Sequence, residues 1–135
     1  MLYATKTALV ILDDLLPWQK VNIAAFLSGG LAARHAIIGE PYRDASGQAY
    51  AALIREPVFI YGADAAGLRR THGRALSRAL DIAIYIREMF ATTHDAANRA
   101  AVAEITSEAL DLVGIGLHGE RKVIDKVTSG LKFMA

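Results

Sequence analysis

Four short apolar runs constrain the fold of this chain more than any other feature. They cover residues 8–12, 58–61, 82–86 and 112–117, and each is bounded by turn or capping residues. Continuous apolar runs of this length are typical of strands buried on both faces of a sheet. Because helix-length segments separate them, the pattern predicts an α/β sandwich with a mixed sheet of about four strands flanked by helices.

Helix start signals precede the two longest connecting segments. Pro17 suits the first turn of a helix that runs to about Arg34, because the proline ring presets a helical φ angle. Asp64 is a good N-cap for a second helix, which we expect to end near Leu80. Both helices follow predicted strands and therefore pack on the sheet.

Three shorter segments complete the predicted pattern. Residues 39–52 contain the type I turn signal Asp44-Ala-Ser-Gly47 and form a loop or a short hairpin. We expect a third helix over about residues 95–104 and a final short helix that ends near Val127. Internal repeats and linkers are absent from the sequence, so residues 1–135 are expected to form a single domain.

Composition restricts the location and the chemistry of the protein. The chain is 53% hydrophobic, but its apolar blocks are too short to span a bilayer, so no membrane segment is predicted. The first residues lead directly into an apolar strand without a basic leader, and we expect a cytoplasmic protein. The absence of cysteine excludes disulfides, thiolate metal sites and cysteine nucleophiles. The four histidines lack a short ligand spacing, so neither a metal nor a cofactor is predicted.

Charge restricts contacts with nucleic acid to local ones. The formal net charge is only +1, which is too small to draw the whole chain to a polyanion. The best local candidate is the predicted second helix, where Arg70, Arg74 and Arg78 repeat every four residues and Arg69 lies at the edge of the stripe. Such a stripe is usually a solvated face, and any tRNA binding is expected to be weak.

Gly114, Gly116 and Gly119 have the spacing of the dinucleotide fingerprint G-x-G-x-x-G. That fingerprint needs a further parallel strand and an acidic residue about 20 residues later, and only residues 120–135 remain. A weaker interpretation is a glycine turn that opens a helix, where free N–H groups and the side chains of Arg121 and Lys122 bind an anion. The alternative is a tight turn with solvated basic residues.

The end of the chain resembles a known family. Ile124-Asp-Lys-Val-Thr128, followed by Leu131-Lys132, is similar to the closing segment I-D-K-V-T-G-x-L-K of type II peptidyl-tRNA hydrolases. Near the amino terminus, Asp14-Leu15 and Lys20-Val21 match the D-L pair and the start of the helix motif G-K-[IV]-A-A-Q-C-x-H-A. The predicted order of strands and helices is also the one this family shows.

The chain departs from that family at the residues expected to be functional. Gln19 replaces the motif glycine, and Ala24, Ala25 and Leu27 replace its glutamine, cysteine and histidine. Residues 88–94 and an additional helix take the place of a short D-A-G-R-T-Q segment. The resemblance therefore implies a bacterial family of unknown function on a peptidyl-tRNA hydrolase II-like scaffold, for which Leu16-Pro-Trp-Gln-Lys-x-Asn22 is a better signature than the hydrolase motif.

The resemblance implies that the first helix starts near the final helix, and hence a shared pocket for an anionic small molecule. The expected lining residues are Asp14, Lys20, Asn22, His118, Lys126 and Thr128, with Gly119, Arg121 and Lys122 as the anion-binding group. Two alternatives remain open. One is an ester or amide hydrolase, aminoacyl- or peptidyl-tRNA hydrolase-like, with an active site rearranged around Lys20 and Asn22. The other is a homodimer that associates through an apolar surface.

Overall fold

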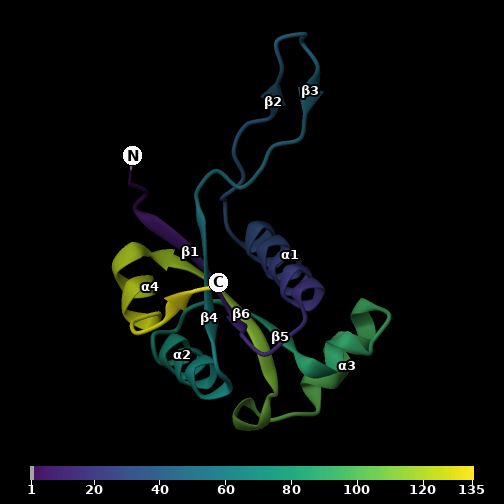
Figure 1. Ribbon diagram of the computed structural model, residues 1–135, viewed down its shortest axis with the longest axis vertical. Helices are drawn as coiled ribbons and strands as arrows, with labels where there is room; N and C mark the ends of the chain where they lie inside the picture. Colours follow the sequence, from purple (N-terminus) through teal and green to yellow (C-terminus); the bar gives the residue numbers. More distant parts are fainter. Residues whose placement is uncertain (1) are drawn as a thin grey trace.

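One mixed sheet forms the centre of the computed structural model, which describes residues 2–135 (Figure 1). All four predicted strands lie in this sheet. A fifth strand, at one edge, was not predicted because it has only two residues and both are exposed. The strand order is β5 (Ile82–Ile86), β6 (Leu112–Glu120), β1 (Thr5–Leu12), β4 (Val58–Ala63) and β7 (Lys132–Phe133).

Strand direction places the carboxyl ends of three strands at one end of the sheet. β1 pairs with β4 in parallel, whereas β6 is antiparallel to both β1 and β5. β1, β4 and β5 therefore run in the same direction, and their carboxyl ends lie at the same end of the sheet. Ligands of open α/β sheets bind beyond the carboxyl ends of strands, so this end of the sheet is the first place to look for a site.

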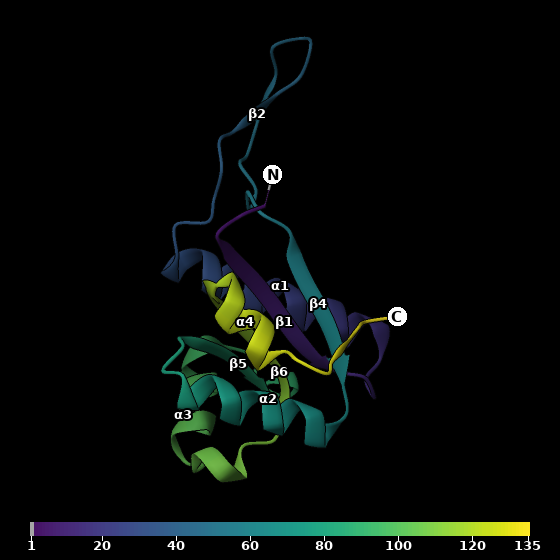
Figure 2. The same cartoon turned by 90° about the vertical axis from the view of Figure 1, so that its left-hand side faces the viewer.

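Helices cover both faces of the sheet. α1 (Pro17–Arg34) lies on one face, and α2 (Ala65–Ser77) and α4 (Arg121–Val127) lie on the opposite face (Figure 2). The short helix η1 (Arg87–Phe90) follows β5 and leads to α3 (Asp95–Ala103) beside that edge strand, and η2 (Ser107–Ala109) precedes β6 (Figure 1). The expected helices are present, although the N-cap Asp64 starts an α2 that ends at Ser77, before the expected Leu80.

The glycines of the G-x-G-x-x-G spacing lie in β6, and the predicted glycine turn is wrong. Gly119 pairs with Lys6 of β1, and a Cβ atom on Gly119 would lie 3.2 Å from Leu80. Gly116 faces the other helix layer, where a Cβ atom would lie 3.1 Å from Leu31 of α1. The glycines are therefore explained by the close approach of helices to a buried strand.

A hairpin stands clear of the domain in both views (Figures 1 and 2). Its strands are β2 (Tyr42–Arg43) and β3 (Ala49–Tyr50), which pair antiparallel, and an isolated bridge joins Ile38 to Ile54 at its base. We refer to residues 38–54 as the arm. The Gly47 N–H donates to the Asp44 carbonyl (3.0 Å), and Gly47 has a φ of 85°, so the predicted turn and hairpin are confirmed.

The core lies on both sides of β1 and β6. Leu9, Ile115 and Leu117 are fully buried, as are Ile23 of α1 and Ile124 of α4. Two-sided burial explains why these strands read as continuous apolar runs in the sequence. Across residues 2–135, the structure has no helix that is both long enough and apolar enough to cross a membrane.

Candidate functional site

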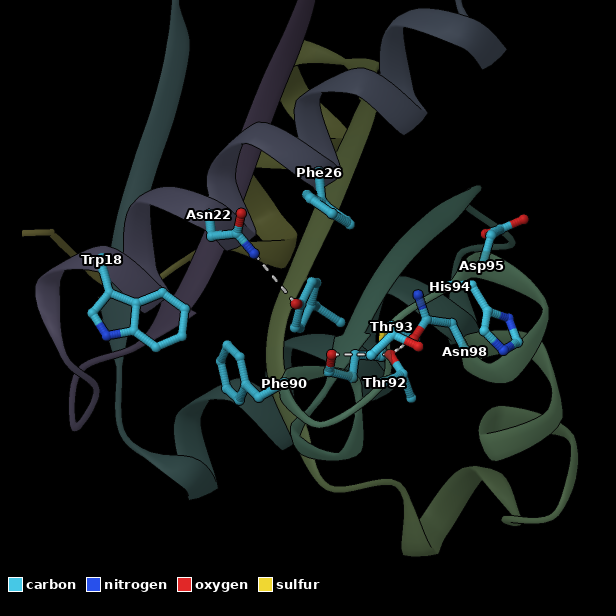
Figure 3. Close-up of a pocket in the computed structure, with 11 residues that line it drawn as sticks. Trp18, Asn22, Phe26, Phe90, Thr92, Thr93, His94, Asp95 and Asn98 are labelled. Atoms are coloured by element: carbon cyan, nitrogen blue, oxygen red, sulfur yellow. Dashed lines mark hydrogen bonds between the residues drawn. The ribbon is translucent and has the colours of Figure 1, made fainter.

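A pocket of about 440 Å³ lies at the carboxyl end of β5, between the start of α1 and the segment that leads from η1 into α3 (Figure 3). Its position agrees with the ligand-binding edge of open α/β sheets. The pocket contains four aromatic side chains and several uncharged polar ones. The lining residues are Trp18, Asn22, Phe26, Tyr85, Met89, Phe90, Thr92, Thr93, His94, Asp95 and Asn98.

One face of α1 lines one side of the pocket. Trp18, Asn22 and Phe26 are four residues apart, so they share one helix face, and all three line the pocket. The helix start is fixed locally, because Pro17 occupies the first turn and Gln19 Oε1 accepts a hydrogen bond from the Leu16 N–H (2.9 Å). Two residues of the stretch from Leu16 to Asn22, identified in the sequence as a signature, therefore line this pocket, namely Trp18 and Asn22.

The aromatic rings form a continuous series around the pocket. Phe90 meets Trp18 edge-on, with ring centroids 6.1 Å apart, and Tyr85 lies 5.3 Å from Phe90. Phe26 meets Tyr85 edge-on at 5.7 Å. Rings at these separations attract one another weakly. The wall of the pocket is therefore largely aromatic.

Polar groups lie between the rings and in the loop before α3 (Figure 3). Asn22 Nδ2 donates a long hydrogen bond (3.4 Å) to the Tyr85 hydroxyl. Thr92 Oγ1 donates to the Met89 carbonyl (3.1 Å) and also contacts the Asn98 side chain. Burial raises the pKa of Tyr85 and the hydrogen bond from Asn22 offsets this only in part, so the phenol stays protonated at neutral pH.

The pocket continues into an apolar hollow of about 450 Å³ along the edge of β5. The two share Phe26, Tyr85, Met89, Asp95 and Asn98, and together we call them the α1–α3 groove. The remaining residues of the apolar hollow are Leu27, Gly30, Ala83, Ile84, Arg99, Val102 and Ala103.

The charge of the groove is close to balanced. Neither lysine nor arginine is among the described residues that line the aromatic pocket. The one carboxylate there, Asp95, forms an ion pair with Arg99 one helical turn later. An exposed pair of this kind contributes little energy, but it leaves no net charge to select an anion. The groove therefore has no excess positive charge to attract the anionic ligand expected from the sequence.

Three predicted site residues lie near the start of α1 but do not share one pocket. Asn22 lines the α1–α3 groove. Lys20 lines a separate hollow of about 380 Å³ together with Asp13 and Lys132. Asp14 lies exposed in the turn between β1 and α1.

Lys126 and Thr128 lie on the other side of the sheet, so the prediction of one shared pocket is wrong. Lys126 lines a hollow of about 450 Å³ with Arg74 and Arg78, between α2 and α4. Thr128 is buried, and its hydroxyl donates to the Ile124 carbonyl (2.8 Å). The sheet separates α4 from α1 (Figure 2), which the sequence resemblance did not reveal.

His118 belongs to a buried polar cluster in β6 instead of an exposed turn. Its Nδ1 lies 2.9 Å from Thr7 Oγ1 and 3.4 Å from Glu56 Oε1, and its ring packs on His35 at 4.5 Å. Glu56 also accepts from the hydroxyls of Thr7 and Thr5. Burial and then the neighbouring His35 lower the pKa of His118, and this outweighs the opposing attraction of Glu56. The cluster joins the base of the arm to the sheet.

The residues expected to bind an anion already have other partners or lie apart. The Arg121 N–H donates to the Ala4 carbonyl and its Nε donates to the Tyr3 carbonyl, both at 3.0 Å. Gly119 is paired within the sheet, and Lys122 is exposed on α4. Because the strand runs directly into α4, the structure does not have the predicted glycine turn that would gather these groups.

Sequence reasoning missed most of the groove. Tyr85, Phe90, Thr92 and Asn98 were not predicted as site residues, although each lines the pocket. The available signal was the stretch 88–94, which replaces a functional segment of the resembling family. Within the described residues, the structure has no group of three or more His, Cys, Asp or Glu side chains placed to hold a metal ion.

The fold and the groove define a mixed α/β domain with a five-stranded sheet and a ligand-sized hollow at its carboxyl edge. The chain belongs to DUF2000, a family of proteins of unknown function, whose model matches residues 5–135. It is similar to a solved structure from Agrobacterium tumefaciens strain C58, described as a protein of unknown function. The two are 43% identical with a TM-score of 0.96, over 99% of this chain and 100% of the other. None of the curated proteins matches this chain.

Proposed function

We propose that the protein binds a small, uncharged, planar molecule in the α1–α3 groove. The observation that carries this proposal is the series of four rings, Trp18, Phe26, Tyr85 and Phe90, around a hollow of about 440 Å³. Ligand pockets are mostly apolar and contain a few polar groups that fix orientation, and this volume lies within their usual range. A heteroaromatic ring system fits the flat aromatic faces.

Asn22 is a polar group beside the rings that such a ligand could contact. Its amide has both donors and an acceptor, and its bond to Tyr85 is long enough to be exchanged for a ligand contact. Thr93 and His94 line the same pocket from the loop before α3. His94 Nδ1 accepts from the Ala97 N–H (3.2 Å), which orients the ring as the cap of that helix.

The scaffold proposal rests on element order. β1, α1, β4, α2, β5, β6 and α4 come in the order of type II peptidyl-tRNA hydrolases, with the arm before β4 and η1, α3 and η2 before β6 as additions. Lys20 occupies the first turn of α1. The motif positions 24, 25 and 27 carry aliphatic side chains, and Leu27 is buried against β6. These features support a hydrolase-like scaffold used for binding without the hydrolase reaction.

A second candidate, an anionic small molecule, is favoured by the hollow between α2 and α4. Arg74, Arg78 and Lys126 line it together with Asp125, whose carboxylate is already paired with Lys6 at 2.7 Å. The hollow therefore has an excess of positive charge, and a bound anion would reduce the repulsion among the three cations. This hollow is on the sheet face opposite α1, so the two candidates are tested separately.

Trp18 is the chain's only tryptophan, and it provides a direct test of the groove. We would titrate the protein with uncharged heteroaromatic probes, namely purine, pterin and indole compounds, and follow tryptophan fluorescence and binding heat. A saturable change is expected for one of these classes. Asn22→Ala and Phe90→Ala should each weaken binding about tenfold, which corresponds to one lost polar or aromatic contact.

Leu76→Ala is the matched control, because Leu76 is exposed on α2, on the opposite face of the sheet. Binding that is equally weakened by Leu76→Ala, or unchanged by both groove variants, would reject the groove as the site. Inorganic phosphate and sulfate test the second candidate, with Arg78→Ala as its variant. Saturable anion binding that depends on Arg78 and leaves Trp18 fluorescence unchanged would assign that ligand to the α2–α4 hollow.

A further inference from the structure

The arm exposes apolar side chains that the other residues described by the structure do not cover. Residues 40–51 all lie exposed apart from the domain, as both ribbon views show (Figures 1 and 2). Ile38, Tyr42, Tyr50 and Leu53 are between 48% and 61% exposed. Four large apolar residues on a projecting hairpin make a surface of the kind that marks a protein interaction site.

Side-chain bonds give the arm a defined shape. Asp44 Oδ1 accepts from the N–H groups of Ser46 (2.9 Å) and Gln48 (3.0 Å), and Asp44 Oδ2 accepts from the Tyr50 hydroxyl (2.8 Å). A two-stranded hairpin is marginally stable in water unless it packs on another element. The arm is thus built for a specific contact, but its exposed side chains have no packing partner within residues 2–135.

The outer face of α1 is the second unpartnered surface. Trp18 is 59% exposed and Val21 is 69% exposed, and Ala25 and Gly29 continue the same helix face without a charged side chain. Gly29 has open space where a Cβ atom would lie, so another backbone can approach closely. A helix face of this composition is normally buried.

We propose that the chain forms a reciprocal homodimer in which the arm of each copy packs along the outer face of α1 of the other. A twofold dimer uses the same pair of surfaces twice, and this chain supplies both halves of the pair. Trp18 belongs to both surfaces, so the arm of the second copy lies beside the mouth of the α1–α3 groove. The dimer does not depend on a ligand in that groove.

Charge is compatible with a second copy as the occupant. The arm carries Glu40 and Asp44 against a single Arg43, whereas the outer face of α1 is uncharged and the basic Arg34 at its end is already paired with Asp81. The contact therefore brings no like charges together. Like charges across an interface would oppose association.

The available area also fits a dimer. Six large apolar side chains on the two surfaces expose on the order of 600 Å² per copy, taking roughly half of each side chain's area. Stable interfaces bury about 800 Å² per partner, and the small residues of α1 and the backbone of the arm supply the difference. The six residues are Trp18, Val21, Ile38, Tyr42, Tyr50 and Leu53.

The test is the oligomeric state of the full chain, measured by sedimentation and by light scattering up to about 100 µM, where a dissociation constant in the micromolar range gives mostly dimer. Tyr42→Asp in the arm and Gly29→Arg in α1 should each weaken the dimer at least about 100-fold, because each places a charge or bulk in the contact. Val21→Asp is a second α1 variant. Leu76→Asp on α2 is the control and should leave the dimer unchanged.

Mixing the variants distinguishes a reciprocal dimer from other arrangements. Tyr42→Asp keeps an intact α1 face and Gly29→Arg keeps an intact arm, so a mixture restores one of the two contacts. We expect native mass spectrometry to show a heterodimer that neither variant forms with itself. Circular dichroism and thermal unfolding confirm that each variant is folded.

Three results would overturn the proposal. A wild-type chain that is monomeric at the highest concentration would remove the dimer. Loss of the dimer with Tyr42→Asp but not with Gly29→Arg or Val21→Asp would show that the arms contact another surface. A mixture of folded variants that stays monomeric would show that the contacts are not exchanged between copies.

Discussion

Gly114 of β6 lies directly beneath Ile23 of α1, and a Cβ atom on Gly114 would come within 2.5 Å of Ile23 Cγ2. Both residues are at the centre of the core, between the sheet and the helix that supplies one wall of the groove. The separation between α1 and β6 is therefore set by a glycine. The position of Asn22, next to Ile23 in sequence, depends on the same contact.

Gly114→Ala should destabilise the fold. The added methyl group has no free space and forces α1 away from the sheet, which costs about 1–3 kcal/mol of the free energy of unfolding. The measurement is urea unfolding followed by circular dichroism. Gly73→Ala in α2 is the control, because a Cβ atom there meets nothing within 4 Å, and alanine in a helix should raise stability by up to about 1 kcal/mol. Equal effects of the two substitutions would contradict the packing argument.

Stability should fall as the pH drops below the usual pKa of histidine, about 6.5. Burial lowers the pKa of His118, followed by the neighbouring His35 and Arg55, and only Glu56 opposes this. Burial and Arg69 lower the pKa of His72 in the same direction. The unfolded chain therefore binds protons first, and stability is lost from the unfolded pKa down through the lower folded pKa.

His118→Gln and His72→Gln test this pH dependence separately and together. Each substitution should reduce the slope of unfolding free energy against pH between about pH 7 and pH 5, and the double variant should be the flattest. Urea unfolding at several pH values measures the slope. If the wild-type slope persists in the double variant, other groups carry the effect. His94→Gln, at the exposed cap of α3, is the matched control.

Replacing Lys6 with an apolar residue should destabilise the fold less than replacing its partner Asp125. Its side chain is 9% exposed, its Nζ lies 2.7 Å from Asp125 Oδ1, and it lies 4.3 Å from the centre of the Phe59 ring. Burial is the largest influence and lowers the pKa of Lys6, but Asp125 and Tyr61 together raise it more, so the net shift is upward. Asp125→Asn leaves a poorly compensated cation and should cost about 1–3 kcal/mol of unfolding free energy.

Lys6→Met is the comparison, because it removes the cation and keeps the apolar stem against Phe59. Its cost should be clearly smaller than that of Asp125→Asn, since replacing a paired charge with an apolar group of similar shape is often close to neutral. Chemical denaturation of both variants under the same conditions shows which one loses more unfolding free energy. A larger loss for Lys6→Met would show that the ion pair itself stabilises the fold.

The sheet could be predicted from the sequence because burial on both faces leaves a local signal. Residues 8–12 and 112–117 are apolar throughout, and each became a central strand. The side of the sheet on which a helix packs leaves no such signal. Lys126 was therefore predicted beside Lys20, although α4 and α1 lie on opposite faces. Phe90 and Thr92 join the groove because the segment after β5 packs opposite the start of α1, where Phe90 meets Trp18, and that contact is tertiary.

The protein should not release an N-blocked amino acid from charged tRNA. Such a reaction needs a polar cluster to activate water beside the ester, and a basic surface that holds the phosphates next to that cluster. Position 27, which carries histidine in the resembling family, is a buried leucine here. The hollow formed by Arg74, Arg78 and Lys126 is on the sheet face opposite α1, so tRNA bound there would lie away from Lys20.

Ester release from an N-blocked aminoacyl-tRNA and filter binding of tRNA at several salt concentrations measure the two parts of this prediction. We expect no turnover, and tRNA binding that is weak and decreases steeply with salt, because only a few phosphates can be neutralised. Arg74→Ala should reduce such binding, whereas Lys20→Ala should not. Steady turnover that Lys20→Ala abolishes without loss of folding would show instead that the start of α1 is a rearranged active site.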